Sequence, residues 1–264
     1  MKINNISYAN YNQKKTVRTN INTSNKTPLF TGVNTFERLN SSSGKLFDYL
    51  FGLKNIVRFV DNNVTAGETL ANKNNSIFRF ISNLGINTVV DLREFDITYQ
   101  KKCQRNGIKY ISVPFTHVLK ERKDSIFDYQ NNAKVHDNFV KQITILIENL
   151  KKGNVYLGCQ YGVDRTNFAL VLEYIINYNS THNAPKIFPT NYTTRNALLN
   201  KNINLVKKII KRLSKEQREI LSLPNDFEEK ILPRRIGAIV KENNQGITQD
   251  ILQRLKLKIQ DIML

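Results

Sequence analysis

The chain has 264 residues, of which 40% are hydrophobic and 23% are charged, a composition typical of a folded protein rather than a disordered one. No apolar stretch approaches the roughly 20 residues that span a bilayer. The polar first 25 residues lack the apolar segment of a secretory signal peptide. The two cysteines, Cys103 and Cys159, indicate free thiols in a reducing compartment. We therefore expect a cytoplasmic protein, with export as a bacterial effector as the alternative.

The formal net charge of +18 indicates anionic partners. The charge is spread about evenly over the N-terminal segment, the middle of the chain and the C-terminal segment, as a compositional bias would produce. The strongest local run is Lys201, Lys207, Lys208, Lys211, Arg212 and Lys215. We expect this run to be a solvated helix face. The alternative is a surface that binds anionic lipid or nucleic acid.

The composition divides the chain into three parts. Residues 1–45 are rich in Asn, Thr, Ser and Lys and have few apolar anchors, so we expect a largely disordered segment. Residues 46–195 carry the patterning of a folded domain. Residues 196–264 are helical in character and basic, which predicts a helical C-terminal extension.

Within 46–195, short apolar runs alternate with helical patterns. Strands are predicted at 56–60, 87–92, 109–115 and 155–157, of which 87–92 has the pattern of a buried parallel strand. Helices are predicted at 70–84, 99–106, 137–150 and 168–178, with Asp137 as the cap of the third. The stretch 117–135 between them is polar and irregular. This alternation predicts an α/β fold in which a mostly parallel central sheet is flanked by helices. The extension is expected to be helical at 205–218, 226–231 and 248–263.

The segment that carries chemistry follows the last of these strands. It reads Cys159-Gln160-Tyr161-Gly162-Val163-Asp164-Arg165-Thr166, and a buried helix follows at once. A cysteine at the carboxyl end of a central strand lies where open α/β sheets bind ligands. The loop amides and the helix N-terminus then make an anion site that favours the thiolate, and the cysteine becomes a nucleophile.

Each other residue type in the segment suits an oxyanion. Gly162 allows an unusual φ, so the loop amides can face inward. Arg165 can grip two phosphate oxygens in bidentate fashion. Thr166 can donate a hydrogen bond to the thiolate. We expect the phosphate to contact residues 160–165: Gln160, Tyr161, Gly162, Val163, Asp164 and Arg165.

This Cys-x5-Arg-Thr segment resembles the phosphate-binding loop of the cysteine-dependent tyrosine and dual-specificity phosphatase superfamily. The segments 56–70, 86–93 and 107–114 also resemble compact dual-specificity-like members, so about residues 55–180 are covered. The resemblance implies that 46–195 is a phosphatase-like catalytic domain that needs no cofactor and no metal. The sequence departs from the family at Gly158, where the family usually has His, and at Asn167, where it often has Gly.

The family uses an Asp as general acid, and three residues are candidates here. Asp164 lies inside the loop, as in related enzymes with an Asp-Arg-Thr arrangement. Asp128 and Asp124 lie in the irregular stretch, 31 and 35 residues before Cys159, near the spacing that is usual in the family. His117 is read as a loop residue.

The resemblance implies a phosphatase that acts through a cysteinyl-phosphate, with phosphotyrosine or phosphoserine/threonine protein as the favoured substrate. Lipid- and inositol-cleaving relatives often carry Lys inside the loop, and this loop has none, although Lys120, Arg122 and Lys123 could supply charge. A phosphoinositide, inositol-phosphate or RNA 5′-phosphate phosphatase is the alternative, as is a non-catalytic phosphate-binding protein. Asp91 and Arg93 are expected to be a structural pair that braces the loop, and Cys103 a surface or half-buried thiol.

Overall fold

The computed structural model describes residues 52–59, 63–115, 126–128, 134–178, 184–185 and 192–244. The chain divides into residues 1–33 and 34–264, and all described residues belong to the second unit. The predicted disordered segment, the helix predicted at 248–263, and the residues His117, Lys120, Arg122, Lys123 and Asp124 lie outside the described residues.

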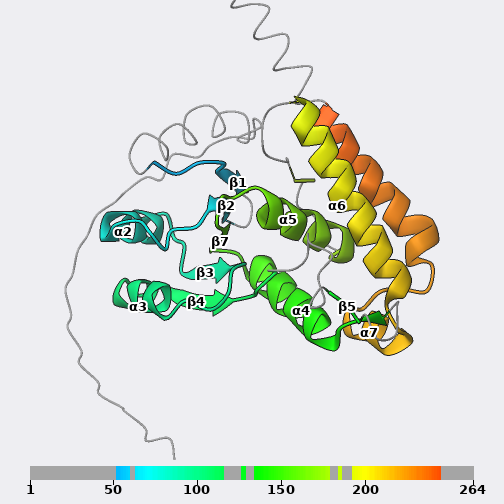
Figure 1. Ribbon diagram of the computed structural model, residues 1–264, viewed down its shortest axis with the longest axis horizontal. Helices are drawn as coiled ribbons and strands as arrows, with labels where there is room; N and C mark the ends of the chain where they lie inside the picture. The colour runs from blue at the N-terminus through cyan, green and yellow to red at the C-terminus, as the bar shows by residue number, and fades with distance from the viewer. Residues whose placement is uncertain are drawn as a thin grey trace, which may run out of the picture. The chain divides into compact units, whose positions relative to one another are not determined.

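The centre of the fold is a five-stranded sheet (Figure 1). Its strands, in spatial order, are β1 (Val57–Phe59), β2 (Val64–Glu68), β7 (Val155–Cys159), β3 (Thr88–Asp91) and β4 (Lys109–Ser112). The last four are parallel to one another, and β1 is antiparallel to β2. The mostly parallel α/β sheet predicted from the sequence is therefore confirmed, and the strand that ends in Cys159 lies at its centre.

Helices cover both faces of the sheet. On one face, α2 (Asn75–Asn83) and α3 (Ile97–Arg105) pack on side chains such as Val89 and Tyr156. On the other face, α4 (Asp137–Lys152) and α5 (Asp164–Ile176) pack on Val90 and Leu157. Because side chains alternate along a strand, Leu157 and Cys159 of β7 share the α5 face, while Tyr156 and Gly158 belong to the opposite face.

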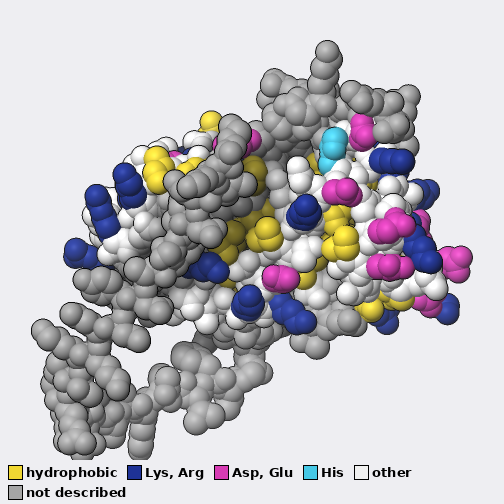
Figure 2. Space-filling view, turned by 90° about the horizontal axis from the view of Figure 1, so that it is seen from below, with side chains coloured by type: hydrophobic (Ala, Val, Ile, Leu, Met, Phe, Trp, Pro, Cys, Tyr) yellow, Lys and Arg dark blue, Asp and Glu magenta, His cyan; other side chains and the backbone are white. Residues whose placement is uncertain are grey.

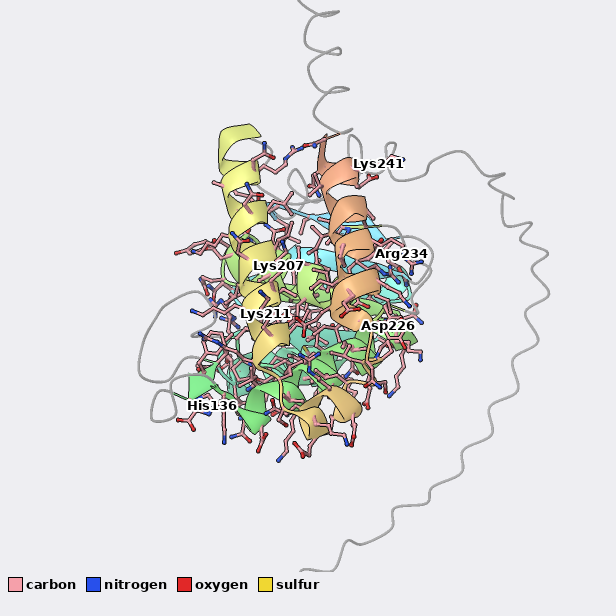
Figure 3. All side chains as sticks on the ribbon, turned by 90° about the vertical axis from the view of Figure 1, so that its right-hand side faces the viewer. His136, Lys207, Lys211, Asp226, Arg234 and Lys241 are labelled. Carbon is pink, nitrogen blue, oxygen red and sulfur yellow. The ribbon has the colours of Figure 1, made fainter. Side chains whose placement is uncertain are left out.

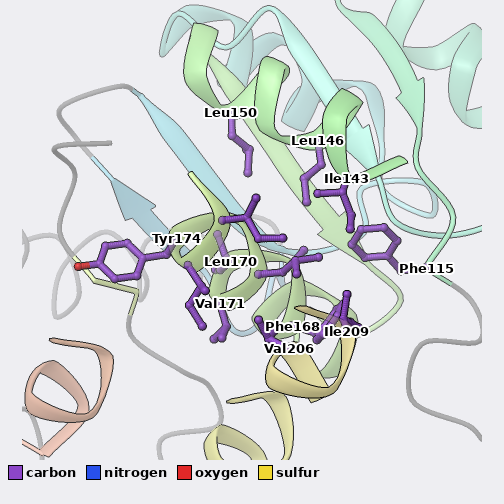
Figure 4. Close-up of a cluster of buried hydrophobic side chains, with 14 of the residues drawn as sticks. Phe115, Ile143, Leu146, Leu150, Phe168, Leu170, Val171, Tyr174, Val206 and Ile209 are labelled. Atoms are coloured by element: carbon purple, nitrogen blue, oxygen red, sulfur yellow. The ribbon is translucent and has the colours of Figure 1, made fainter. Parts of the chain in front are cut away.

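The C-terminal part is helical, as predicted. It contains α6 (Tyr192–Arg212), α7 (Lys215–Ile220), a short π-helix η1 (Phe227–Ile231) and helical residues 232–244. Val206 and Ile209 of α6 enter the same buried cluster as Phe168 of α5 (Figure 4). α6 thus packs directly on the helix that follows Cys159, and it spans the predicted limit at residue 195. The three-part division stays a prediction.

The predicted basic run lies on α6 and the start of α7. Lys201, Lys207, Lys208 and Lys211 are exposed, and Figure 3 shows Lys207 and Lys211 on α6 beside the helix that carries Arg234 and Lys241. The cations of Lys208 and Arg212 also lie over the Phe127 ring, at 5.1 and 4.9 Å from its centroid. On the face shown in Figure 2, basic and acidic side chains intermingle. Contact with anionic lipid stays a prediction.

Several sequence-based boundaries were wrong. The helix predicted from residue 70 begins at Asn75, because the Asn74 side chain caps it by accepting from Ser76 N. Asp137 is the first residue of α4 rather than its cap, and its carboxylate accepts from Gln217 Nε2 at 2.8 Å.

Two strand assignments also changed. The stretch read as irregular contains the antiparallel pair β5 (Phe127–Asp128) and β6 (Lys134–Val135). β2 was not predicted at all, because its last three residues, Ala-Gly-Glu, have little strand propensity. Within the ranges that the structure describes, no helix has the length and apolar character to cross a membrane.

Candidate active site

β7 delivers Cys159 to the carboxyl edge of the sheet, between β2 and β3. The residue is 3% exposed, and its carbonyl accepts a hydrogen bond from Thr69 N at 2.7 Å. On the other side, Leu92 N donates to the Gly158 carbonyl at 2.8 Å. The backbone that presents the sulfur is therefore tied to both neighbouring strands.

The loop after Cys159 turns back on the end of β2. Gly162 has a φ of +69°, in the left-handed region that favours glycine. A β-carbon there would lie 2.4 Å from both Glu68 N and the Gly67 carbonyl carbon, so only glycine fits without movement. Asn55 Nδ2 donates to the Tyr161 carbonyl at 2.9 Å and ties the outer side of the loop to the segment before β1.

The amides of this loop are available to a ligand. Among the described residues, no backbone N–H of residues 160–165 donates a hydrogen bond to a backbone carbonyl. They include the first two helical residues of α5, whose N–H groups have no partner within the helix. Successive unpaired N–H groups beside a helix N-terminus bind a tetrahedral anion well. The predicted phosphate-contacting residues 160–165 thus lie together, and their contact with phosphate stays a prediction.

Thr166 connects the helix to the cysteine. Its side chain is buried, and its Oγ1 donates to Cys159 Sγ at 3.1 Å. The same oxygen lies 3.5 Å from the Gly67 carbonyl. A hydroxyl has a single proton, so it serves one acceptor at a time, and the sulfur contact is the shorter. This is the hydrogen bond proposed from the sequence to stabilise a thiolate.

Arg165 is half-buried at the start of α5, and its Nη1 donates to the Leu92 carbonyl at 3.3 Å. The described residues show no ion pair between Arg165 and the adjacent Asp164. The guanidinium is instead directed to the end of β3. One contact at this length leaves most of its five N–H donors for a ligand.

The end of β3 is itself braced by Asp91 and Arg93. Arg93 donates to both carboxylate oxygens of Asp91, from Nε at 3.0 Å and from Nη2 at 2.8 Å. Tyr110 Oη donates to the same carboxylate at 3.1 Å. These bonds fix the turn around Leu92, whose N–H and carbonyl contact Gly158 and Arg165. The expected Asp91–Arg93 pair is present.

The candidate acids differ in position. Asp164 is exposed and is the first residue of α5. Asp128 lies in β5 opposite Lys134 of β6, next to the Phe127 ring that the α6 cations cover. Asp164 is therefore part of the cysteine loop, whereas Asp128 lies on a separate strand.

Cys103 lies on the buried face of α3 and is fully buried, which corrects the expectation of a surface or half-buried thiol. Burial, with a smaller effect from the Asp91 charge, raises the pKa of its thiol to about 12. In the ranges that the structure describes, no three His, Cys, Asp or Glu side chains come together as metal ligands.

Sequence reasoning missed the residues that support the loop from below. They are Asn55, the β2 residues Gly67 to Thr69, and Tyr156, whose Oη donates to the Glu68 carbonyl at 2.5 Å. The only local signal was Gly67, a glycine next to an apolar residue, which marks a close backbone approach.

No protein-family model matches the chain, and no curated protein matches its sequence. Solved structures to which it is similar include a DUF442 protein of Shewanella putrefaciens CN-32 provisionally described as a phosphatase. The identity is 12% over 72% of this chain and 96% of that one, with a TM-score of 0.38. P. aeruginosa TpbA matches at 13% identity over 70% and 91%, with a TM-score of 0.35. The core catalytic domain of the PP-IP phosphatase SIW14 from S. cerevisiae matches at 12% over 72% and 93%, with a TM-score of 0.34. At this level of likeness, the function must be judged from the chain's own residues.

Proposed function

We propose that the chain is a cysteine-dependent phosphatase that hydrolyses phosphate monoesters through a cysteinyl-phosphate intermediate. The observation that carries this proposal is the Thr166 hydroxyl, 3.1 Å from the sulfur of Cys159, at the start of α5 in a loop whose amides pair with no backbone carbonyl of the described residues. A buried structural cysteine has no need of a hydroxyl donor and of an arginine six residues further on. The resemblance of Cys-x5-Arg-Thr to the phosphatase loop supports the same function.

The first chemical step transfers the phosphoryl group to sulfur. The Cys159 thiolate attacks phosphorus in line, an S–P bond forms, and the P–O bond to the leaving group breaks. Arg165 and the amides of residues 160–165 hold the three equatorial oxygens, where charge accumulates in the transition state. A carboxylic acid gives its proton to the departing oxygen.

The second step returns the enzyme to its starting state. Water attacks phosphorus, the S–P bond breaks, and the carboxylate accepts the proton that the water loses. The Thr166 hydroxyl stabilises the departing thiolate through the hydrogen bond already present. The products are the alcohol or phenol and inorganic phosphate.

Asp164 is our first choice for the acid, with Asp128 second and Asp124 third. Asp164 is exposed and is the first residue of α5, next to Arg165, so its backbone is held beside the phosphate loop. Asp128 would have to reach the substrate from β5. His117 follows if all three fail.

The favoured substrates are phosphotyrosine or phosphoserine/threonine proteins. The loop contains no Lys that could pair with the extra phosphates of a polyphosphorylated ligand. The exposed Tyr161 side chain, at 71%, offers an apolar surface at the loop for a peptide side chain. Phosphoinositides, inositol phosphates and RNA 5′-phosphates remain as alternative substrates.

The test is release of phosphate from phosphotyrosine peptides, phosphoserine peptides, phosphoinositides and 5′-phosphorylated RNA, measured side by side. We expect the peptides to be hydrolysed fastest, and Cys159→Ser to abolish release from every substrate. Preference for a phosphoinositide or RNA would overturn the substrate class but keep the chemistry. Absence of release from these substrates and from an aryl phosphate, with phosphate still bound, would instead identify a non-catalytic phosphate-binding protein.

A further inference from the structure

The phenol of Tyr156 lies directly beneath the cysteine loop. Tyr156 and Gly158 are two residues apart on β7 and so belong to the same face of the sheet. A β-carbon at Gly158 would lie 3.3 Å from Tyr156 Cε1, 3.5 Å from the Gly67 carbonyl oxygen and 3.6 Å from that of Glu68. The tyrosine ring therefore fills the space into which a side chain before the cysteine would point.

The Tyr156 hydroxyl holds one particular peptide group. Its Oη donates to the carbonyl of Glu68 at 2.5 Å. That carbonyl and the N–H of Thr69 belong to the same planar peptide unit, and they point in opposite directions. The Thr69 N–H in turn donates to the Cys159 carbonyl at 2.7 Å. The peptide is thus held at one end by Tyr156 and at the other by the nucleophile's own backbone.

The same segment of β2 supports the rest of the loop. Glu68 is the register partner of Cys159, and the Glu68 N and Gly67 carbonyl carbon form the surface against which Gly162 packs. A tilt of the Glu68–Thr69 peptide would therefore move the support of both the cysteine and the glycine turn.

The phenol suits this task because it stays a donor. Tyr156 is fully buried, and burial, followed by the nearby charges of Glu68 and Cys159, raises the pKa of its hydroxyl well above the ordinary value. Hydrogen bonds in series polarise one another, so a chain that runs from a phenol through a peptide to a carbonyl is stiffer than its separate parts.

We propose that Tyr156 is a positioning residue of the catalytic loop, which acts through the Glu68–Thr69 peptide and supplies the loop support that Gly158 lacks. The proposal rests on the proposed function, in that the loop it positions is the phosphatase loop. The supporting side chain is thus two residues earlier on β7 than position 158, where the phosphatase superfamily usually has histidine.

The test compares Tyr156→Phe with Tyr174→Phe. The second variant also removes a hydroxyl from a buried tyrosine, but on α5, away from the loop. The readouts are kcat and KM for an aryl phosphate, the acidic limb of the pH profile, and the pH dependence of Cys159 alkylation by iodoacetamide. Thermal unfolding checks that both variants fold.

For Tyr156→Phe we expect kcat to fall about tenfold or more, since a buried carbonyl loses its donor. KM should change much less. The acidic limb and the alkylation curve should both move to higher pH, because a less well supported loop stabilises the thiolate less. Tyr174→Phe should leave all three readouts near wild type. If Tyr156→Phe kept wild-type kcat and an unmoved alkylation curve, the proposal would be wrong.

The alkylation readout separates this proposal from the proposed function. If the unaltered chain hydrolysed no phosphate ester, yet Tyr156→Phe moved the alkylation curve, phosphatase activity would be refuted and the role of Tyr156 supported. If Tyr156→Phe failed to fold, hydrogen exchange in the unaltered chain would decide. The Thr69 amide should then be at least about tenfold slower to exchange than an unprotected amide, and complete exchange at the first time point would overturn the proposal.

Discussion

The backbone of Gly162 packs directly on the backbone of Gly67, so that a β-carbon on Gly162 would lie 2.4 Å from the Gly67 carbonyl carbon. This contact sets the shape of the phosphate loop, because it fixes the turn on the rigid end of β2 rather than on another loop. Two glycines 95 positions apart in the chain thus make one structural unit.

The first prediction tests that contact with Gly162→Ala. The added methyl group must push the loop off β2, and a displacement of about 1 Å can lower a rate about a hundredfold. We expect phosphatase activity to fall by at least that factor, as measured with an aryl phosphate. Gly107→Ala is the matched control, because Gly107 also has a φ of +69° but has no atom within 4 Å of the added carbon. It should lose roughly 1–2 kcal/mol of stability from backbone strain and keep its activity. Equal activity in the two variants would contradict the prediction.

The second prediction concerns the nucleophile. Cys159→Ser should abolish turnover while the fold and phosphate binding persist, because a serine hydroxyl is not ionised in the same loop. Steady-state hydrolysis of an aryl phosphate and calorimetric titration with inorganic phosphate measure the two properties. Cys103→Ala, the control for loss of a buried thiol, should remain active. Residual activity in Cys159→Ser above about a hundredth of wild type would refute the cysteine mechanism.

The third prediction concerns Arg165→Lys. Lysine cannot form the planar, two-pronged contact with phosphate oxygens. It would also lose the guanidinium hydrogen bond that Arg165 donates to the Leu92 carbonyl. We expect transition-state stabilisation to fall by roughly 2–4 kcal/mol, the scale of losing a key oxyanion donor. Arg79→Lys, at an exposed position of α2, should leave kcat/KM unchanged. A near-normal rate in Arg165→Lys would show that the arginine is structural.

The cysteine loop could be predicted from the sequence because all its chemistry lies within eight consecutive residues between a strand and a helix. The parallel sheet was predictable too, since β3 and β7 are short, mostly apolar and buried runs that alternate with helical patterns. β2 escaped prediction because its five residues include Ala66 and Gly67, which have little preference for strands. Its assignment depends on pairing with β1 and β7, which are distant from one another in the chain.

The support of the loop could not be predicted for a similar reason. The Asn55–Tyr161 contact joins residues 106 positions apart, and the Tyr156–Glu68 contact joins residues 88 apart. Nothing local in the sequence marks Tyr156 as more than another apolar residue of a buried strand. From the sequence, Gly158 indicates only that the family's usual histidine is missing. The structure shows that the Tyr156 ring occupies the space where that side chain would lie.

The fourth prediction uses the raised pKa of Cys103, about 12. The thiolate is the reactive form. Because Cys103 stays a thiol well below that pH, it should react slowly at every pH from about 6 to about 9. Cys159 should be the thiol that iodoacetamide modifies under these conditions, and inorganic phosphate should protect it by filling the loop. Mass spectrometry of the digested protein identifies the modified residue. Faster modification of Cys103 than of Cys159 would contradict both expectations.

The last prediction concerns the general acid. If Asp164 donates the proton, Asp164→Asn should slow esters with poor leaving groups by about a hundredfold or more, and nitrophenyl phosphate much less. Nitrophenolate is a stable anion that departs without a proton, so it conceals the loss. Asp128→Asn should then behave as wild type with both esters. The opposite pattern would assign the role to Asp128.

The pH profile gives an independent answer. Attack requires the thiolate, so activity falls on the acidic side, and proton donation requires the carboxylic acid, so activity falls on the basic side. We expect a bell-shaped profile centred below about pH 7, whose basic limb disappears only in the variant that lacks the acid. Asp164 is favoured because α5 fixes its backbone beside Arg165, whereas Asp128 must approach from β5, whose neighbour Phe127 is covered by Lys208 and Arg212. If both variants kept the basic limb and neither depended on the leaving group, Asp124 would be the next residue to replace, followed by His117.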